Sequence, residues 1–197
     1  MDIYLLRHGQ STSNERQLVC GAADYPLSAI GKAQAERVCR YLRNIPFTSI
    51  YSSPLSRALD SIAPLGESGR VSIVPELAEL DTGEASHISV HELWDRELRY
   101  RYQGLNPGLR YPGGECLNDM LGRVGNWFSI AMAKWGEGDT VLISGHEGTV
   151  CGIIHWLLKI DITHYPTFLI GNCDHVHITI NDEGQIRYRF IPLASLT

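Results

Sequence analysis

The sequence has few cysteines, and their spacing forms no known framework. The five are Cys20, Cys39, Cys116, Cys151 and Cys173, an odd number that contains no C-x-x-C pair. This usage excludes a disulfide-stapled fold and a zinc knuckle. It favours reduced thiols in a cytoplasmic protein.

Long apolar runs, repeats and low-complexity segments are also missing. No uncharged apolar run approaches the roughly 18 residues that a membrane span needs, so we expect no membrane-embedded protein. The first residues carry Asp2 and then only the short apolar run 3–6, so we expect no signal peptide. A chain of 197 residues without a Ser/Pro linker is predicted to form one domain over residues 1–197.

An excess of positive charge is absent as well. The formal net charge is −5, from 17 basic and 22 acidic side chains. As a whole, such a molecule attracts neither nucleic acid nor an anionic membrane surface. Any anion that it binds must therefore be held by a local cluster of Arg, Lys, His or backbone amides.

What the sequence does contain is an alternation of short apolar runs with segments of helical periodicity. The predicted strands cover residues 3–6, 47–51, 71–74, 140–143, 175–180 and 186–190. The predicted helices cover residues 28–44, 53–65, 90–102, 116–135 and 147–158. This alternation predicts a three-layer α/β/α sandwich with a mostly parallel sheet and an antiparallel edge.

Two histidines stand where the predicted strands end. His8 follows the first strand, and His146 follows the strand of residues 140–143. Arg7 precedes His8, and Arg57 lies in the first turn of a predicted helix. Ligands of open α/β sheets bind at the carboxyl ends of the strands. Two His, two Arg and helix-start amides therefore predict a cationic pocket that fits a phosphate dianion.

Six motifs occur in a fixed order along the chain. They are Arg7-His8-Gly9-Gln10-Ser11-x-x-Asn14, Cys20-Gly21-x-x-Asp24, the segment 26–35, Ser52-Ser53-Pro54-Leu55-Ser56-Arg57-Ala58, Leu77-x-Glu79-x-Asp81-x-Gly83, and Pro112-Gly113-Gly114-Glu115 followed by Arg123-Val124. Together they resemble the histidine phosphatase superfamily, in the branch related to phosphoglycerate mutases. The resemblance extends from Ile3 to about Asn172 and implies a phosphoglycerate mutase-like fold.

The resemblance implies that phosphoryl transfer proceeds through a covalent intermediate. His8 would attack phosphorus and form a phosphohistidine, which splits hydrolysis into two steps. Arg7, Arg57 and His146 would hold the three equatorial oxygens of the phosphoryl group while it is transferred. Because these side chains supply the positive charge, the resemblance implies neither a metal nor another cofactor.

Four further residues receive a role from the same resemblance. Glu79 would protonate the leaving alkoxide and then take a proton from the attacking water. Asn14 would donate a hydrogen bond to the phosphoryl group, and Cys20 and Gly21 belong to the predicted substrate-binding residues. Three neighbouring acids, Glu76, Asp81 and Glu84, leave the identity of the general acid open.

Other side chains have two readings in the sequence. His87 and His91 have the spacing of a metal pair on a helix, but without a third ligand we favour exposed side chains. Trp94 and Tyr100 either line the substrate entrance or pack in a core or lid. His175 and His177 alternate on a predicted strand and are expected to face the surface of the sheet.

The chain departs from the family pattern at two places. Ala85-Ser86-His87 replaces the Trp-Glu-Gly that many members carry, in a loop tied to specificity. Glu147 replaces a glycine directly after His146, and we count it among the substrate-binding residues. Near a dianion, each like-charge pair costs about 4 kcal/mol at ~4 Å and an effective dielectric of ~20. Glu147 is therefore expected to point away, to pair with a base or to meet a cationic part of the substrate; a weakly active site is the alternative.

The resemblance favours a phosphatase that acts on a small phosphomonoester. The short segment between Glu79 and His146 and the motif at 112–115 are most similar to alpha-ribazole phosphatases, which implies alpha-ribazole 5'-phosphate of cobalamin synthesis as the leading substrate. A phosphosugar or phosphoglycerate phosphatase, a mutase, and a non-catalytic phosphate-binding regulator remain alternatives. The expected partner is a small phosphorylated metabolite; nucleic acid and membrane are not expected, and a homodimer is left open.

Overall fold

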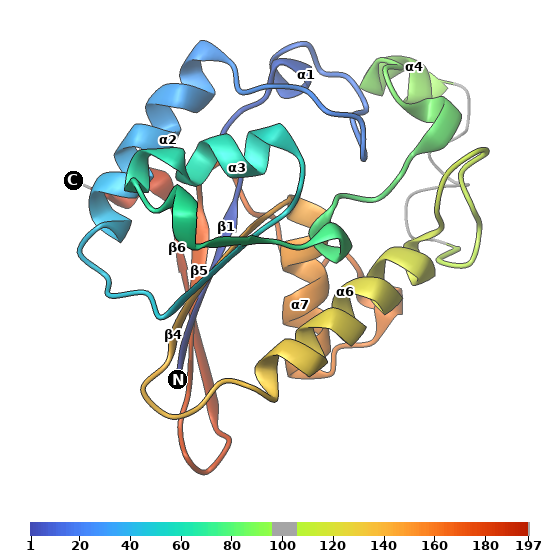
Figure 1. Ribbon diagram of the computed structural model, residues 1–197. Helices are drawn as coiled ribbons and strands as arrows, with labels where there is room; N and C mark the ends of the chain where they lie inside the picture. Colours follow the sequence, from blue (N-terminus) through green and yellow to red (C-terminus); the bar gives the residue numbers. More distant parts are fainter. Residues whose placement is uncertain (96–105, 197) are drawn as a thin grey trace.

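The computed structural model describes residues 1–95 and 106–196. In these residues, six strands form one sheet in the order β3-β2-β4-β1-β5-β6 (Figure 1). The strands are β1 (Asp2–Arg7), β2 (Ser49–Ser52), β3 (Val71–Ile73), β4 (Thr140–Gly145), β5 (His175–Ile180) and β6 (Ile186–Ile191). The first four run parallel, whereas β5 pairs antiparallel with β1 and with β6. The predicted fold class is confirmed.

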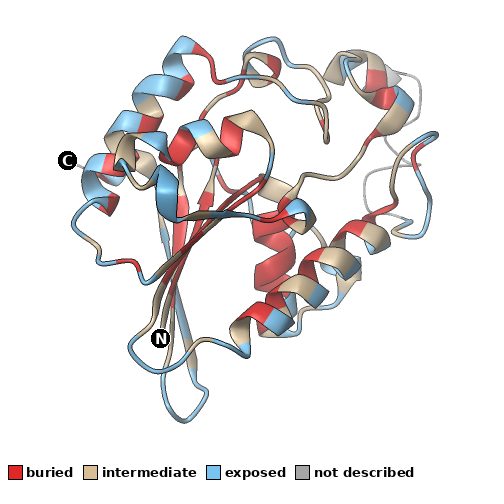
Figure 2. Cartoon of the chain, viewed as in Figure 1, coloured by how far each residue is buried: buried red, intermediate tan, exposed pale blue. Residues whose placement is uncertain are grey.

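Helices cover both faces of this sheet. The helices α2 (Ala29–Leu42) and α3 (Ser56–Ile62) lie on one face, and α6 (Leu117–Met132) and α7 (Glu147–Leu158) lie on the other (Figure 1). The burial colours of Figure 2 show α7 and the central strands as mostly buried and the outer side of α2 as exposed. Ser28 caps α2 as predicted, because its side chain accepts a hydrogen bond from Gly31 N.

Shorter helices fill the connections. They are the α-helices α1 (Thr12–Glu15) and α4 (Val90–Asp95), and the 3₁₀ helices η1 (Ala63–Leu65), η2 (Ser68–Arg70), η3 (Pro75–Leu77), η4 (Gly83–Ala85), η5 (Ile162–His164) and η6 (Leu193–Ser195). The predicted helix 90–102 begins as α4, and its part from residue 96 on lies outside the described residues, as do Tyr100 and the side chain of Trp94. Within residues 1–95 and 106–196, no helix combines the length and the apolar character of a membrane span.

The core is divided by the alternation of side chains along β1. Leu5 faces the layer of α6 and α7, and Leu6 faces the layer of α2; both are completely buried. Next to β1, Ile143 on β4 is also inaccessible, and Leu5 is its register partner. The same register sets Arg7 opposite Gly145. The residues that follow β1 and β4, His8 and His146, therefore emerge side by side.

Of the predictions about histidines outside this region, one is confirmed and one is corrected. His87 and His91 are both exposed, as favoured. They do not share a helix, because His87 precedes α4 with a left-handed φ of 75° and bonds to Tyr25, whereas His91 lies on α4. The surface placement is wrong for His175, which is fully buried because α2 covers that face of β5. Its ring lies 5.3 Å from the ring of Tyr41 on α2.

Candidate active site

A pocket of about 140 Å³ lies at the carboxyl end of β1. Its lining residues are Arg7, His8, Ser11, Asn14, Leu18, Cys20, Gly21, Arg57, Glu79 and Glu147. Every residue assigned to the site from the sequence belongs to this group except His146, which is completely buried next to it. The ring centroids of His146 and His8 are 5.1 Å apart. The structure thus brings the predicted residues together, while their catalytic roles stay predictions.

His8 is held as a neutral imidazole with a defined tautomer. Its Nδ1 lies 2.6 Å from the carbonyl oxygen of Gly9, which can only accept, so Nδ1 carries the hydrogen. Burial, together with the positive charges of Arg57 and Arg7, lowers the pKa of His8 to about 3. The Nε2 atom therefore keeps its lone pair at neutral pH, which is what a nucleophile requires.

Arg57 is almost inaccessible, and main-chain oxygens aim its guanidinium. Nη1 donates to the carbonyl of Ala23 at 2.8 Å, and Nη2 donates to the carbonyl of Gly21 at 2.7 Å. Gly21 has a φ of 49°, and a Cβ there would overlap the side chain of Thr82, so the loop needs glycine. Carbonyl oxygens orient the guanidinium without neutralising it, which leaves its charge for an anion.

His146 is completely buried beside the pocket. Its Nε2 lies 2.7 Å from Oγ of Ser53, and no atom in the described residues pairs with its Nδ1. Burial, followed by the charge of Arg57, lowers the pKa of His146 well below its usual value. His146 is therefore neutral and carries one ring N–H, either on Nε2 toward Ser53 or on Nδ1.

Glu79 is the member of the acidic group 76–84 that lines the pocket. Its Oε2 accepts a hydrogen bond from Gly148 N at 3.1 Å, and its Oε1 accepts one from Leu80 N at 2.9 Å. A Cβ at position 148 would overlap the Glu79 carboxylate, so the close approach to α7 depends on glycine there. Asp81 instead accepts from Gly83 N. This placement favours Glu79 as the general acid over its neighbours.

Asn14 is oriented by bonds to its amide oxygen. Oδ1 accepts from the N–H of Ser11 at 3.1 Å, from Oγ of Ser11 at 3.0 Å and from Asn172 Nδ2 at 3.4 Å. Because Oδ1 is occupied by these protein donors, Nδ2 of Asn14 is left to donate to a phosphoryl oxygen. Cys20, in contrast, donates its thiol to Ala23 O at 3.2 Å, so it supports the loop that aims Arg57.

Glu147 begins α7 and points into the same pocket. Its Oε2 lies 2.9 Å from Nη1 of Arg7, so of the three expected arrangements the structure shows pairing with a base. About a third of the Glu147 side chain is exposed, 34%. Burial raises the pKa of Glu147, Arg7 opposes this rise, and the negative charge of Glu79 adds to it.

Two positioning residues of the site had no role in the sequence analysis. Asn172 donates from Nδ2 to the carbonyl of His8 at 3.0 Å, across 164 positions of the chain. Ser53 contacts His146. Ser53 belongs to a recognised motif, and its hydroxyl group could have indicated a hydrogen-bonding role in the site. Asn172 lies in no periodic pattern, so only the folded chain reveals it.

The loop that carries Glu79 is fastened by a second pair of residues. Arg123 on α6 binds Glu115 through two bonds, Nε to Oε1 at 2.8 Å and Nη2 to Oε2 at 2.9 Å. Arg123 also donates to the carbonyls of Ala78 at 2.8 Å and Glu79 at 3.1 Å. Glu115 accepts from Asp81 N at 3.1 Å. Both residues occur in the recognised motifs, but their function as a clamp appears only in the structure.

Comparison with known proteins agrees with this geometry. Residues 3–190 match the model of the histidine phosphatase superfamily (branch 1). The chain belongs to this superfamily.

Proteins that are similar to this chain are named for different activities. The probable phosphoglycerate mutase GpmB of Yersinia pestis is 33% identical over 127 residues, which cover 62% of this chain and 59% of that protein. The structure of a mycobacterial glucosyl-3-phosphoglycerate phosphatase, determined with VO3, has a TM-score of 0.82 at 26% identity and covers 96% of each chain. The alpha-ribazole phosphatase of Shigella flexneri has a TM-score of 0.83 at 24% identity over 97% of this chain and 96% of its own, and shows the shared fold.

Proposed function

We propose that the protein is a phosphatase that hydrolyses a small phosphomonoester through a phosphohistidine at His8. The observation that carries this proposal is the neutral, buried His8, whose free Nε2 belongs to the same pocket as two arginines. Arg7 and Arg57 supply the positive charge that stabilises a phosphoryl group in the transition state of its transfer. Glu79, on the wall formed with α7, supplies the proton.

In the first step, His8 Nε2 attacks phosphorus and the bond from phosphorus to the ester oxygen breaks. The leaving alkoxide takes a proton from the Glu79 carboxyl group. Arg7, Arg57 and the N–H of His146 bind the equatorial oxygens, and Asn14 Nδ2 donates a further bond. The products of this step are an alcohol and N-phosphorylated His8.

In the second step, water attacks the phosphohistidine. The Glu79 carboxylate, left ionised by the first step, takes a proton from that water as the oxygen–phosphorus bond forms. The nitrogen–phosphorus bond breaks, and His8 returns to its neutral form. Inorganic phosphate leaves and Glu79 is again protonated, so that the cycle closes without an external proton carrier.

The leading candidate substrate is alpha-ribazole 5'-phosphate, on the strength of the short segment between Glu79 and His146 and the Pro112-Gly113-Gly114-Glu115 motif. A phosphoglycerate-type phosphatase is the second candidate, supported by the 26% identity to the mycobacterial phosphatase over nearly the whole chain. Mutase activity is a third, supported by the Yersinia relative.

Release of inorganic phosphate tests the proposal. The purified protein is incubated with p-nitrophenyl phosphate and with a set of phosphorylated metabolites that includes the candidates above. We expect turnover that His8→Ala abolishes. A wild-type protein that binds phosphate but releases none from any of these esters is instead a phosphate-binding regulator, which is the result that contradicts the proposal.

A further inference from the structure

Glu147 places a second carboxylate, besides that of Glu79, inside a pocket lined by Arg7, His8 and Arg57. The residue follows His146, lines the pocket with His8 and Arg57, and pairs with Arg7 at 2.9 Å. An acidic side chain in an anion site weakens the binding of every anion. A carboxylate at this place therefore calls for a function that offsets this loss.

The contacts of Arg7 allow Glu147 to remain in place when phosphate binds. Nη1 of Arg7 serves both Glu147 Oε2 and the carbonyl of Ile170. Its Nε is buried, and no atom of the described residues pairs with it. A guanidinium has five N–H groups. The printed contacts of the Arg7 guanidinium with the described residues use Nη1 alone, so a phosphate oxygen can bind at Nη2 without displacing the carboxylate, which then lies beside the bound phosphate.

A count of charges shows what such a pocket prefers. Arg7 and Arg57 contribute the positive charges of the lining, whereas His8 and His146 are neutral because burial lowers their pKa values. A phosphate dianion already balances both arginines, and Glu147 adds a negative charge. With substrate bound, the site has a surplus of negative charge even when Glu79 is protonated. A cationic group next to the phosphate relieves this surplus, and a carboxylate increases it.

We propose that Glu147 selects the substrate by the charge of the group beside its phosphate, with a cationic group preferred, a neutral group next and a carboxylate last. This inference rests on the proposed phosphatase activity and narrows its substrate class. It favours an amine-bearing phosphomonoester, admits neutral esters such as a nucleoside-like phosphate, and disfavours phosphoglycerates.

Three compounds of equal length isolate the charge. They are O-phosphoethanolamine, 2-hydroxyethyl phosphate and 2-phosphoglycolate, each with two carbons after the ester oxygen. The second carbon carries an ammonium group in the first compound and a hydroxyl group in the second, and it is the carboxylate carbon in the third. Their inhibition constants against hydrolysis of p-nitrophenyl phosphate are compared between variants, so that the leaving ability of each compound, which is the same for every variant, cancels. They are measured for the wild type, Glu147→Gln and Glu137→Gln at pH 7.5 and constant ionic strength.

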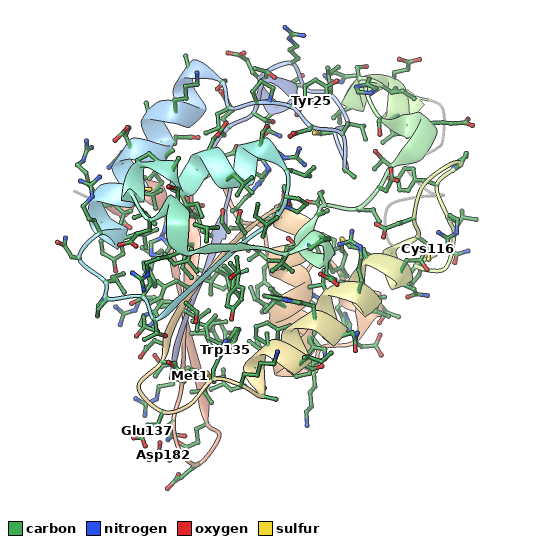
Figure 3. The ribbon with its side chains drawn as sticks, in the orientation of Figure 1. Met1, Tyr25, Cys116, Trp135, Glu137 and Asp182 are labelled. Atoms are coloured by element: carbon green, nitrogen blue, oxygen red, sulfur yellow. The ribbon has the colours of Figure 1, made fainter. Side chains whose placement is uncertain are left out.

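Glu137 is the matched control, because its substitution changes the net charge equally. It is exposed and lies with Met1 and Asp182 at the end of the molecule where β1 begins (Figure 3), whereas the pocket lies where β1 ends. The wild type and Glu137→Gln should bind the ammonium compound more tightly than the carboxylate compound. In Glu147→Gln this ratio should fall about tenfold, the size of one partly desolvated charge pair.

Equal ratios in the wild type and Glu147→Gln, or tightest binding of phosphoglycolate by the wild type, would overturn the inference and leave the phosphatase proposal standing. Absence of p-nitrophenyl phosphate hydrolysis in the wild type would instead overturn the proposed function itself. Glu147→Gly serves as the second variant, and the same fall in the ratio is expected from it.

Discussion

At the scale of single residues, burial prepares the site before any ligand arrives. His8 is kept neutral by its surroundings, and its hydrogen is fixed on Nδ1 by Gly9 O, so no proton has to leave before attack. Arg57 is oriented by neutral carbonyls, so its positive charge is not neutralised and can act on an anion. The carboxylate of Glu79 is placed by Gly148 N at the start of α7. Each group is thus arranged as its part in the proposed two-step reaction requires.

Glu79→Gln should slow alkyl phosphates more than p-nitrophenyl phosphate. A poor leaving group needs the proton, whereas nitrophenolate leaves almost unaided. General acid catalysis is typically worth roughly 10²–10⁴-fold, so the contrast should be large. The measurement is kcat for both substrates in the wild type and the variant. Equal losses of kcat on both substrates would show that Glu79 serves binding or folding. Asp81→Asn, on the same loop, is the control.

Glu147→Gly should tighten the binding of vanadate and inorganic phosphate. The carboxylate on Arg7 repels anions, although its place at the start of α7 stabilises it by about 0.3–1 kcal/mol. The part of the gain that comes from exposed charge should shrink in high salt, since the Debye length is about 3 Å at 1 M. Titration with vanadate at low and high salt measures this. Weaker binding by the variant would mean that the carboxylate organises the site.

Residue types were easier to predict than their partners. His8, Arg57 and Glu79 stand in recognisable motifs, and the fold brings them to one pocket. For Glu147, the electrostatic argument allows three arrangements: pointing away, pairing with a base, or meeting a cationic part of the substrate. It does not select one of them, and only the structure shows the pairing with Arg7. Asn172 was not foreseen, since its contact depends on the closed chain.

At the scale of elements, the clamp of Arg123 and Glu115 connects α6 to the loop that carries Glu79. The guanidinium meets the carboxylate and, in succession, the carbonyls of Ala78 and Glu79. Burial alone would raise the pKa of Glu115, but hydrogen bonds from Arg123 and from the amide of Asp81 hold it below its usual value. The position of Glu79, the proposed general acid, is therefore set by a residue on α6.

Arg123→Lys should destabilise the protein by about 1–3 kcal/mol, because an ammonium cannot satisfy the carboxylate and the carbonyls together. Arg110→Lys is the control: Arg110 pairs with Asp119 in a more exposed setting, and such pairs are worth about 0–1 kcal/mol. Urea unfolding of the three proteins measures the difference. Equal stabilities for both variants would show that the clamp contributes nothing.

Long elements with clear periodicity were predicted closely, and short ones were not. Ser28 and the spacing after it indicated α2, and the apolar run 140–143 indicated β4. The helix α1 has four residues and depends on a capping box between Ser11 and Asn14. Such a helix is too short for a hydrophobic period, and the hydrogen bonds of its capping box stabilise it.

At the scale of the whole molecule, the parallel register of β1 and β4 decides where the candidate active site lies. Leu6 stands opposite Ser144 and Arg7 opposite Gly145, so the two histidine motifs meet although they lie far apart in the chain. The sequence indicated the sheet type, and from it the shared edge followed. The burial of His175 did not follow, because it depends on how α2 lies across the sheet.

The stability of the fold should fall as the pH drops below about 6.5. The pKa values of His8 and His175 are lowered by burial to about 3 and about 4, and that of His146 lies well below its usual value. The unfolded chain binds protons at these sites near pH 6.5 and the native chain does not, so acid favours unfolding. Glu147, whose pKa is raised, acts in the opposite direction.

Between pH 7.5 and 5.5 each of these three histidines should cost about 1.4 kcal/mol, and together about 4 kcal/mol, of unfolding free energy. Urea unfolding at both pH values measures the loss. His164→Gln, which removes an exposed histidine, should show the same loss as the wild type. Equal stability at pH 7.5 and 5.5 would contradict the neutral, buried state of these side chains.

The central claim is that His8 carries the phosphoryl group between the two steps. The direct measurement mixes the protein with p-nitrophenyl phosphate, quenches it in alkaline denaturant and locates the phosphoryl group by mass spectrometry of the peptides. The account predicts one phosphoryl group on His8 that survives alkali, is lost in acid and is absent from His8→Ala. Phosphate release at the wild-type rate by His8→Ala, with no phosphorylated His8 in the wild type during turnover, would contradict it.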